Sequence, residues 1–367
     1  MSLARCLLAL SILGATGLAG QRNGSDEWRP RTVPLYGLSY SPEVGVLVGA
    51  GLVHTRYAFR ALPPSTRLTA AAAYATGART YRVTLAGEFR RPLAPATVAV
   101  DLYASGLEIL RFYGLGNASV ASGPDSVCQV RQTQFAIAPT LSVPLAARLR
   151  LAAGVMVKHA RTHADSGALL FAAGPAYGSG DFGAAGVRTL LELDTRDHPT
   201  AATGGLHLVI AAQWYPALWD AVRPFGSLSA EAATYASTGD PPRATMALRA
   251  GLAGVSGTVP FHELVYIGGG TTLRGYPEQR FAGRSGAYAN AELRLRVGWL
   301  SVGDVGVLGL ADAGRVWGED DASRRWHAAG GGGLWLALRH RRANTVTVTW
   351  ARGTEHPALY VRVGFMF

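Results

Sequence analysis

Apolar and polar positions alternate with a period of two along most of the chain, in stretches of about 9–13 residues each. The clearest stretch covers residues 289–297, where the apolar set is Ala289, Ala291, Leu293, Leu295 and Val297 and the polar set is Asn290, Glu292, Arg294 and Arg296. Side chains along a strand point alternately to opposite faces of the sheet. In a transmembrane barrel one face meets lipid and the other a water-filled lumen. The pattern therefore predicts an all-β fold, a transmembrane antiparallel β-barrel.

Three further stretches show the same alternation, and together they reach the end of the chain. They cover residues 81–90, 345–351 and 359–367; in the last, the predicted outward set is Leu359, Val361, Val363, Phe365 and Phe367. Marking every such stretch gives strand starts near residues 35, 46, 67, 81, 97, 131, 147, 185, 204, 225, 244, 285, 305, 325, 344 and 358. We therefore predict about sixteen strands, an even number, as closed bacterial barrels have. Closure is required because an open sheet edge would leave backbone groups without partners in hydrocarbon.

The connections between these stretches differ in length from one side of the barrel to the other. If both termini lie in the periplasm, the periplasmic connections are short and turn-like, at 63–65, 92–95, 144–145, 239–242 and 339–344. The opposite side includes three long loops, near residues 107–130, 159–184 and 255–284. Short turns on one side and long loops on the other are typical of outer-membrane barrels.

The N-terminus has the three parts of a secretory signal peptide. Arg5 supplies the positive charge, an apolar core follows, and Gly17-Leu18-Ala19 matches a small-x-small cleavage site. The apolar run is shorter than the roughly 20 residues that a membrane-spanning helix needs. We therefore expect export to the bacterial outer membrane. The predicted division is a signal peptide at 1–19, a short periplasmic leader at 20–34 and the barrel at 35–367.

Composition agrees with a barrel and argues against other classes. Of the 367 residues, 49% are hydrophobic, 16% are charged and 46 are glycine, which suits neither a helical bundle nor a disordered chain. The net charge of +11 comes from arginines scattered singly along the alternating stretches. Nucleic-acid-binding proteins gather basic residues on one face, so we expect no nucleic-acid partner. A polar lumen and anionic lipid headgroups explain the charge. Signal cleavage would leave Cys128 as the single cysteine, which excludes a disulfide framework.

The third long loop contains the segment Gly268-Gly269-Gly270-Thr271-Thr272-Leu273-Arg274-Gly275-Tyr276. It follows the eleventh predicted strand, and its last four residues, Leu273, Arg274, Gly275 and Tyr276, resemble the loop tip of the BamA/TamA outer-membrane assembly superfamily. The resemblance implies that the loop folds into the lumen and that Arg274 contacts Asp312 and Glu292. Alternation independently points Glu292 into the lumen. A planar guanidinium can bind two carboxylates in a fixed geometry.

Other segments match the same family. The turn formed by residues 194–199 resembles the family's turn after strand eight, and Asp194, Arg196 and Asp197 can cap it through side-chain bonds to the backbone. Residues 112–117 resemble a motif in the loop after strand five. The final stretch, with Tyr360, Phe365 and Phe367, looks like the C-terminal recognition signal of outer-membrane barrels and also serves as the closing strand.

The resemblance implies a role in inserting or translocating proteins at the outer membrane. The partners would be outer-membrane lipid and either unfolded outer-membrane proteins or a periplasmic partner protein. The residues before the predicted barrel leave no room for the periplasmic POTRA modules of assembly members, so we expect a barrel-only member. By analogy, strand one near 35–40 and strand sixteen near 358–367 form a weakened seam, because Ser41-Pro42 interrupts a short strand one.

Two alternative functions remain open. One is a passive pore or purely structural barrel, in which the cluster around Arg274 only holds the barrel together. The other is the membrane module of a separately encoded periplasmic partner. The passive pore predicts a steady ion conductance that rises when the loop carrying Arg274 is deleted. The partner module can be tested by the neighbourhood of its gene.

The sequence carries no recognisable enzyme motif. His159, His163 and Asp165 lie at the start of a long loop, where a spacing of four has meaning for a metal site only on a helix. We find no P-loop, dinucleotide fingerprint, cysteine-based zinc pattern or nucleophile elbow. We therefore expect no catalytic residue, no cofactor and no metal.

Overall fold

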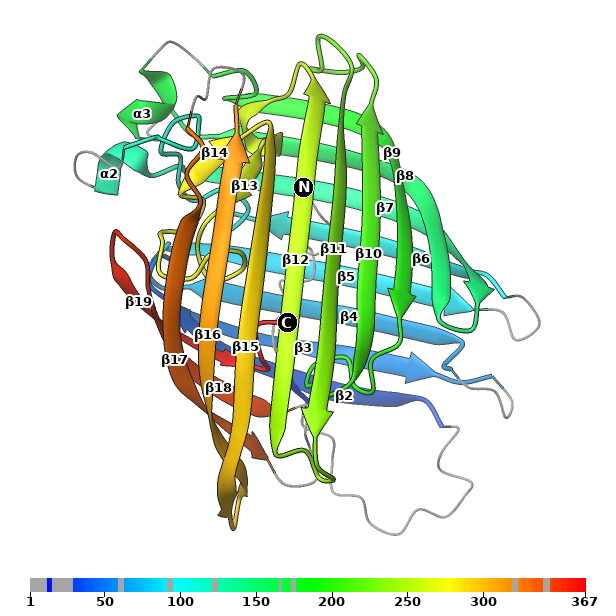
Figure 1. Ribbon diagram of the computed structural model, residues 1–367. Coiled ribbons are helices and arrows are strands. Elements are labelled where there is room, and N and C mark those ends of the chain that lie inside the picture. The colour runs from blue at the N-terminus through cyan, green and yellow to red at the C-terminus, as the bar shows by residue number, and fades with distance from the viewer. Residues whose placement is uncertain are drawn as a thin grey trace.

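A closed antiparallel β-barrel dominates the computed structural model (Figure 1), which describes residues 12–14, 29–58, 63–90, 95–120, 125–164, 167–172, 176–318, 323–338 and 344–367. The main sheet has 17 strands; one is the three-residue strand β1 (Ile12–Gly14), and the other sixteen form the barrel. The barrel strands are β2 (Arg31–Ser41), β3 (Gly45–Arg56), β4 (Thr66–Ala75), β5 (Thr80–Arg90), β6 (Thr97–Ser105), β7 (Gln132–Ala146), β8 (Leu149–Thr162), β9 (Asp181–Asp194), β10 (Gly205–Tyr215), β11 (Phe225–Thr238), β12 (Ala244–Gly257), β15 (Ser285–Leu300), β16 (Gly303–Trp317), β17 (His327–Leu338), β18 (Thr345–Arg352) and β19 (Pro357–Val363).

Each barrel strand pairs antiparallel with its neighbours along the chain, and β19 meets β2 to complete the ring. The predicted all-β barrel of about sixteen strands is therefore confirmed. All sixteen strands begin within four residues of their predicted starts. The strands could be located because alternate side chains of each strand face lipid on one side of the sheet and the polar lumen on the other, which gives the sequence a period of two.

The polar and apolar sets also lie on the predicted faces. On β15, Asn290, Glu292 and Arg294 are buried in the lumen, whereas Leu293 and Val297 are exposed on the outer surface. On β18 the threonines are buried and Val348 and Trp350 are exposed. The lumen is therefore lined by polar groups and filled enough to bury them.

Several boundaries differ from the prediction. The predicted turn at Pro144-Leu145 is wrong, because β7 continues to Ala146 and its register with β8 shifts between Pro144 and Ala146. Such an irregularity lets a strand accommodate the missing N–H of proline. Strand β2 is longer than expected: it begins at Arg31, inside the predicted leader, and runs through Ser41. Strand β19 is shorter, because it ends at Val363 and Phe365 and Phe367 do not continue its outward face.

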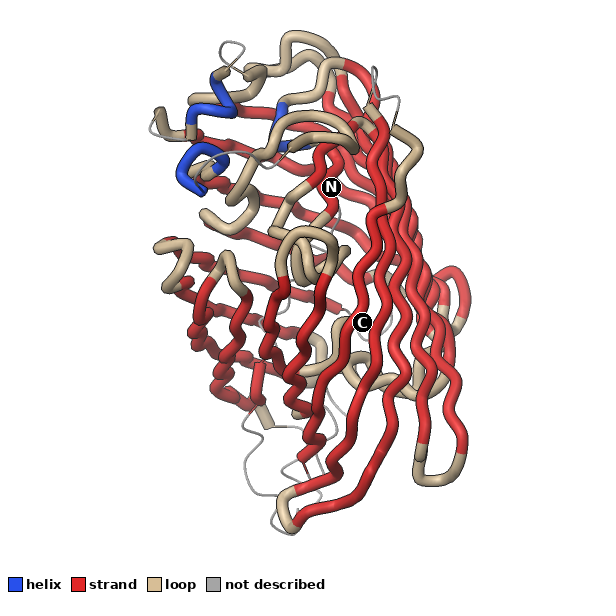
Figure 2. Tube along the Cα trace, turned by 60° about the vertical axis from the view of Figure 1, so that its left-hand side comes forward, coloured by secondary structure: helices blue, strands red, loops and turns tan. Residues whose placement is uncertain are grey.

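The long loops fold together at one end of the barrel (Figure 1). Loops 106–131, 163–180 and 258–284 carry the short elements α2 (Asp125–Cys128), α3 (Ala168–Phe171), η1 (Phe261–Glu263), β13 (Val265–Ile267) and β14 (Phe281–Gly283). Their apolar residues share one buried cluster that includes Ile109, Phe112, Leu170, Phe261 and Tyr266. From the second direction, in Figure 2, the helices and loop segments again gather at this end. The loops thus form a packed cap.

Some predicted features fall outside the described residues. They are the signal peptide apart from residues 12–14, most of the leader, Asp165, and the larger parts of the predicted turns at 92–95 and 339–344. Among the residues that are described, no helix is long and apolar enough to cross a membrane.

Candidate functional site in the barrel lumen

The loop between β12 and β15, residues 258–284, folds back into the lumen. Its two arms pair as the short strands β13 and β14, and residues 260–270 are all buried. At Gly275 the backbone φ is +79°, and an added Cβ would lie 2.6 Å from the backbone nitrogen of Gly353. Glycine is required there because it tolerates positive φ and the close approach of a neighbouring chain.

Arg274 lies at the centre of this loop and binds two carboxylates on the barrel wall. Its Nε and Nη2 donate to the two oxygens of Asp312, each at 2.8 Å, and its Nη1 donates to Glu292 Oε1 at 2.6 Å. The backbone N–H of Arg274 also donates to Asp312 Oδ2 at 3.0 Å. The Arg274 side chain is 1% exposed. Burial alone would lower the pKa of Arg274, but hydrogen bonding to Asp312 and the charge of Glu292 raise it above its ordinary value.

A second arginine extends this cluster. Arg294, two residues after Glu292 on β15, donates from Nε and Nη2 to Glu292 Oε2 at 2.9 and 2.8 Å. The group therefore contains two guanidinium groups and two carboxylates, all buried. Its charges balance, which is the condition under which buried ions are tolerated. Alternation placed Arg294 in the lumen but gave no reason to link it with Arg274.

The rest of the loop tip packs against β16 and against the closing strand β19. Leu273 and Tyr276 pack with Ile267, Phe281 and Val316 in one buried cluster. The backbone N–H of Gly275 donates to Tyr360 Oη on β19 at 3.2 Å. Arg362 Nη2, also on β19, donates to the carbonyl of Gly270 at 2.9 Å. Tyr360 thus points into the lumen, and the loop holds β19 from inside the barrel.

Residues that the sequence did not single out connect this loop to other loops at the same end of the barrel. Gln279 donates to the Glu108 carbonyl at 2.6 Å and accepts from the N–H of Leu110 at 2.7 Å. Arg280 donates to Glu355 at 2.8 Å and to the Ser119 carbonyl at 2.7 Å. Both side chains are buried. The sequence offered one indication of their role, which is that they follow the Arg274 motif within four residues. Hydrogen bonds between distant loops produce no periodic pattern in the sequence.

The motif at 112–117 ends inside this network. Asn117 is fully buried; it accepts from the N–H of Val316 at 3.2 Å and donates to the carbonyl of Arg325 at 2.8 Å. His327 Nε2 lies 2.9 Å from the Asn117 carbonyl oxygen. Phe112 belongs to the apolar cluster of the cap. The motif therefore joins the loop after β6 to strands β16 and β17.

The seam between β2 and β19 is the weakest junction of the barrel. It has one pair of partner residues, Val361 and Tyr40, whereas β19 pairs with β18 along seven. The predicted reason for this weakness is wrong. Strand β2 is long and pairs with β3 along all its 11 residues. The seam is short because β19 ends at Val363 and leaves the rest of the β2 edge without its partner.

The β2 edge also takes up an added strand. Strand β1, inside the predicted signal peptide, pairs antiparallel with Leu35, Tyr36 and Gly37 of β2. Within the described part of the chain, no strand pairs with this edge between Arg31 and Pro34.

The turn after β9 is stabilised by its own side chains. Arg196 donates from Nε and Nη2 to Asp194, at 2.9 and 2.7 Å, and from Nη1 to the Pro199 carbonyl at 3.0 Å. Asp197 accepts from the backbone N–H of Thr203 at 2.9 Å and from the Thr203 hydroxyl. These bonds hold a connection of ten residues, 195–204, in one conformation.

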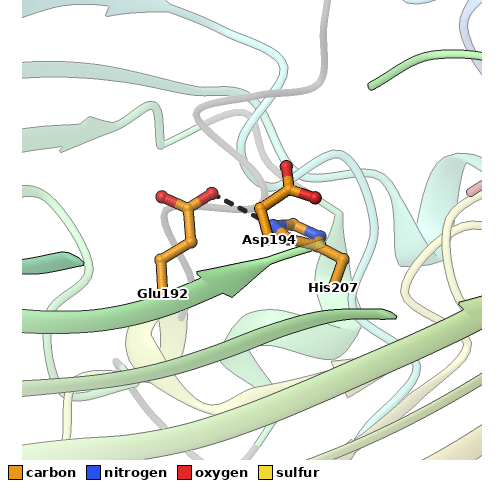
Figure 3. A group of neighbouring side chains, drawn as sticks. All are labelled: Glu192, Asp194 and His207. Atoms are coloured by element: carbon orange, nitrogen blue, oxygen red, sulfur yellow. Dashed lines mark hydrogen bonds and ion pairs between the residues drawn. The ribbon is translucent and has the colours of Figure 1, made fainter. Parts of the chain in front are cut away.

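Near this turn Glu192, Asp194 and His207 come together (Figure 3), with their possible ligand atoms within 4.8 Å of one another. His207 Nε2 lies 3.0 Å from Glu192 Oε1. Each carboxylate is also bound by a guanidinium, Glu192 by Arg150 at 2.5 Å and Asp194 by Arg196. A divalent cation would have to displace both arginines, so we interpret this group as an ion-pair network rather than a metal site.

Comparison with known proteins supports a family assignment. Residues 67–337 match the family model described as the Omp85 superfamily domain. No curated protein matches the sequence.

Solved structures share the fold at low sequence identity. One is BamA from Haemophilus ducreyi lacking POTRA domains 1–3, with a TM-score of 0.67, 14% identity, and coverage of 92% of this chain and 71% of that chain. CdiB from Acinetobacter baumannii has a TM-score of 0.55 and 12% identity, with 91% of this chain and 59% of that chain covered. CdiB from Escherichia coli also has a TM-score of 0.55, with 13% identity and coverage of 91% and 62%. The chain therefore spans about three fifths of the length of the CdiB structures.

Removing the central guanidinium should release the loop. We expect Arg274→Ala to lower the free energy of unfolding by about 3–5 kcal/mol, because it leaves Asp312 and Glu292 buried without their partner. Urea unfolding of the refolded barrel in vesicles, with limited proteolysis of residues 258–284, measures both effects. Arg161→Ala is the matched control, because Arg161 is an exposed arginine at the rim of β8. An Arg274→Ala chain as stable as this control would contradict the assignment.

The base of the same loop carries a pH-dependent element. His262 is buried between Phe182 and Phe261, with ring centroids 5.4 Å from each. Burial lowers the pKa of His262 from 6.5 to about 4. As pH falls, His262 therefore becomes protonated near pH 6.5 in the unfolded chain but only near pH 4 in the folded chain. By linkage, folding loses stability as pH falls through this window.

We expect the free energy of unfolding to decrease by on the order of 3 kcal/mol between pH 6.5 and 4 because of this residue. His262→Phe should remove that part of the pH dependence. Adjacent Glu263 carries the opposite charge near Lys158; burial would raise its pKa, but Lys158 lowers it from 4.5 to about 2, so it titrates below this window. Equal pH profiles for the wild type and His262→Phe above pH 4.5 would contradict the assignment.

Proposed function

The chain belongs to the Omp85 superfamily, and from that premise we propose that it inserts or translocates polypeptides at the bacterial outer membrane by opening the seam between β2 and β19. The single observation that carries this proposal is the seam itself, with one pair of partner residues in a barrel whose other strands pair along seven or more. Opening it breaks the fewest backbone hydrogen bonds of any junction in the ring.

An opened seam exposes a strand edge that extended polypeptide can join. Unpaired N–H and C=O groups along an edge strand accept an added strand through main-chain bonds, without demanding a particular sequence. A polypeptide paired there would satisfy its backbone while it enters hydrocarbon, where unsatisfied groups cost several kcal/mol each.

The lumen loop supports the same mechanism from inside. Through Gly270 and Gly275 the loop holds Arg362 and Tyr360 of β19. Through Arg274 it is fixed to β15 and β16. Strand β19 therefore remains attached to the loop and to β18 when its contact with β2 breaks. We propose that the loop keeps the closing strand in place so that the seam can open and close again.

A reconstituted insertion assay tests this proposal. We expect vesicles containing the refolded chain to take up an unfolded test barrel faster than empty vesicles, measured as the appearance of its folded, heat-modifiable form. Arg274→Ala should abolish most of the acceleration, because β19 loses its attachment through the loop. Conductance across a planar bilayer is recorded with the same preparations.

Uptake equal to that of empty vesicles would refute the proposal. Steady conductance in that case would favour the passive pore, and neither activity would favour a membrane module for a periplasmic partner. The folded state of each variant is checked first by its gel mobility before and after heating, so that a folding failure is not mistaken for a loss of activity.

A further inference from the structure

A row of small residues crosses four neighbouring strands on the lumen side of the wall. In register, the row consists of Ala211 on β10, Ser229 on β11, Ala253 on β12 and Gly286 on β15. Their neighbours along the strands, such as Leu252, are exposed on the outer surface, so the row faces inward. The interior of a barrel is filled by its inward side chains, and a row of small ones leaves space.

The space in front of this row is a lumen cavity of about 510 Å³. That volume lies within the roughly 300–1,000 Å³ of pockets that bind small molecules. The cavity extends from the cap, where Leu107 and Leu110 line it, to the region of the turn after β9, where Glu192 and His207 line it.

The wall between these two ends is largely apolar. Leu190 on β9, Val209 on β10 and Val255 on β12 line the cavity, and each is half-buried. The interior of an outer-membrane barrel is normally polar, because it is in contact with water. Covering apolar side chains with another apolar group is favourable, so this wall favours a ligand with a hydrocarbon chain.

A buried donor on another part of the wall also lines the cavity. Arg82 on β5, separated from β10 by four strands of the ring, is 7% exposed. Its Nη2 donates to Glu108, whereas its Nε is buried and has no hydrogen-bond partner among the described residues. An unsatisfied buried donor costs free energy, so a ligand that brings an oxygen to Arg82 Nε gains a hydrogen bond that the protein itself does not supply.

The charges around Arg82 determine which kind of oxygen fits. Glu108 already neutralises Arg82, and both side chains are buried. A ligand carboxylate or phosphate would place a second negative charge beside Glu108, and like charges in a buried site repel each other strongly. A neutral carbonyl oxygen accepts the same hydrogen bond without this repulsion. At the other end of the cavity, Glu192 is bound by Arg150 and His207, so its charge is already compensated.

We propose that this cavity is a binding site for an uncharged, single-chain acyl ester of the monoacylglycerol class. Its acyl chain would lie along the apolar wall, in the space that the row of small residues leaves. Its ester carbonyl would accept a hydrogen bond from Arg82 Nε. The inference does not depend on the proposed function, because neither the seam nor a polypeptide substrate takes part in it.

Photo-crosslinking locates such a ligand. The probe is monopalmitoylglycerol with a diazirine near the end of its acyl chain, added to the refolded chain in phosphatidylcholine nanodiscs, and labelled residues are identified by mass spectrometry. Leu190 lines the cavity, whereas Leu191 is on the outer face and pairs with the exposed Leu151, so these two leucines form an internal control. We expect an excess of unlabelled monopalmitoylglycerol to reduce labelling of Leu190 at least tenfold and to leave labelling of Leu191 nearly unchanged.

Two analogues of the ligand test the role of Arg82 without changing the protein. Hexadecylglycerol has an ether in place of the ester and lacks the carbonyl, and palmitate carries a carboxylate in place of the ester. We expect each to compete for Leu190 labelling about tenfold less well than monopalmitoylglycerol, the first because it loses the hydrogen bond and the second because Glu108 repels it.

A variant that fills the cavity tests the role of the small residues. Ala253→Phe adds a ring to the row and should abolish labelling of Leu190. Ala212→Phe is the matched control, because Ala212 is on the outer face of β10 and pairs with the exposed Leu228. The gel mobility of both variants before and after heating shows whether they are folded.

Three results would overturn the inference. The first is labelling of Leu190 that unlabelled monopalmitoylglycerol does not reduce, which would mean that the probe is only surrounding lipid. The second is equal competition by either analogue, and the third is unchanged labelling of Leu190 in folded Ala253→Phe. Because the analogues are tested on the wild-type chain, the inference can be refuted even if the variant does not fold.

Discussion

The buried ion cluster of Arg274, Asp312, Glu292 and Arg294 is the interaction on which the arrangement of the lumen depends. It joins the loop to two wall strands through charge-assisted bonds of 2.6–2.9 Å, and the two positive and two negative charges of the cluster balance. A cluster of this kind adds little stability relative to an apolar core, but removing one member leaves buried charges unpaired. The cluster therefore fixes the position of the loop in the lumen more than it stabilises the fold. From that position the loop reaches β19 and the other loops of the cap, and Arg294 of the cluster contacts Phe365 and Phe367.

The same contacts explain how a barrel can have one weak junction and still remain closed. Strand β19 is held by seven residue pairs with β18 and by the loop from inside, but by a single pair with β2. In other junctions, long ladders satisfy the backbone groups that hydrocarbon would leave unpaired. At the seam the chain instead turns inward at Gly364 and leaves part of the β2 edge available. The short strand β19 thus pairs weakly with β2 in the wall and is held firmly by the loop in the lumen.

Much of the fold could be predicted from the sequence because a barrel wall separates two solvents. Alternation identified the strands and placed Glu292 and Arg294 in the lumen, and the Arg274 motif suggested the partners that the structure brings into contact with it. The inward turn of residues 365–367 could not be predicted, since apolar residues continue the period of two past Gly364, where the strand has ended and the backbone φ is positive. Contacts of Gln279 and Asn117 with distant loops were also missed, because a three-dimensional contact between irregular segments has no periodic signature.

A reversible crosslink across the seam tests the central claim most directly. Tyr40→Cys with Val361→Cys would join β2 to β19 at their one point of pairing, and Val348→Cys with Val361→Cys would join β19 to β18 as a matched control. Both are made with Cys128→Ser, and each is assayed for insertion of an unfolded test barrel before and after reduction. We predict that the oxidised seam crosslink stops the acceleration, that reduction restores it, and that the control crosslink has no effect. Full acceleration with the seam crosslinked would show that the seam does not open, and would contradict the account.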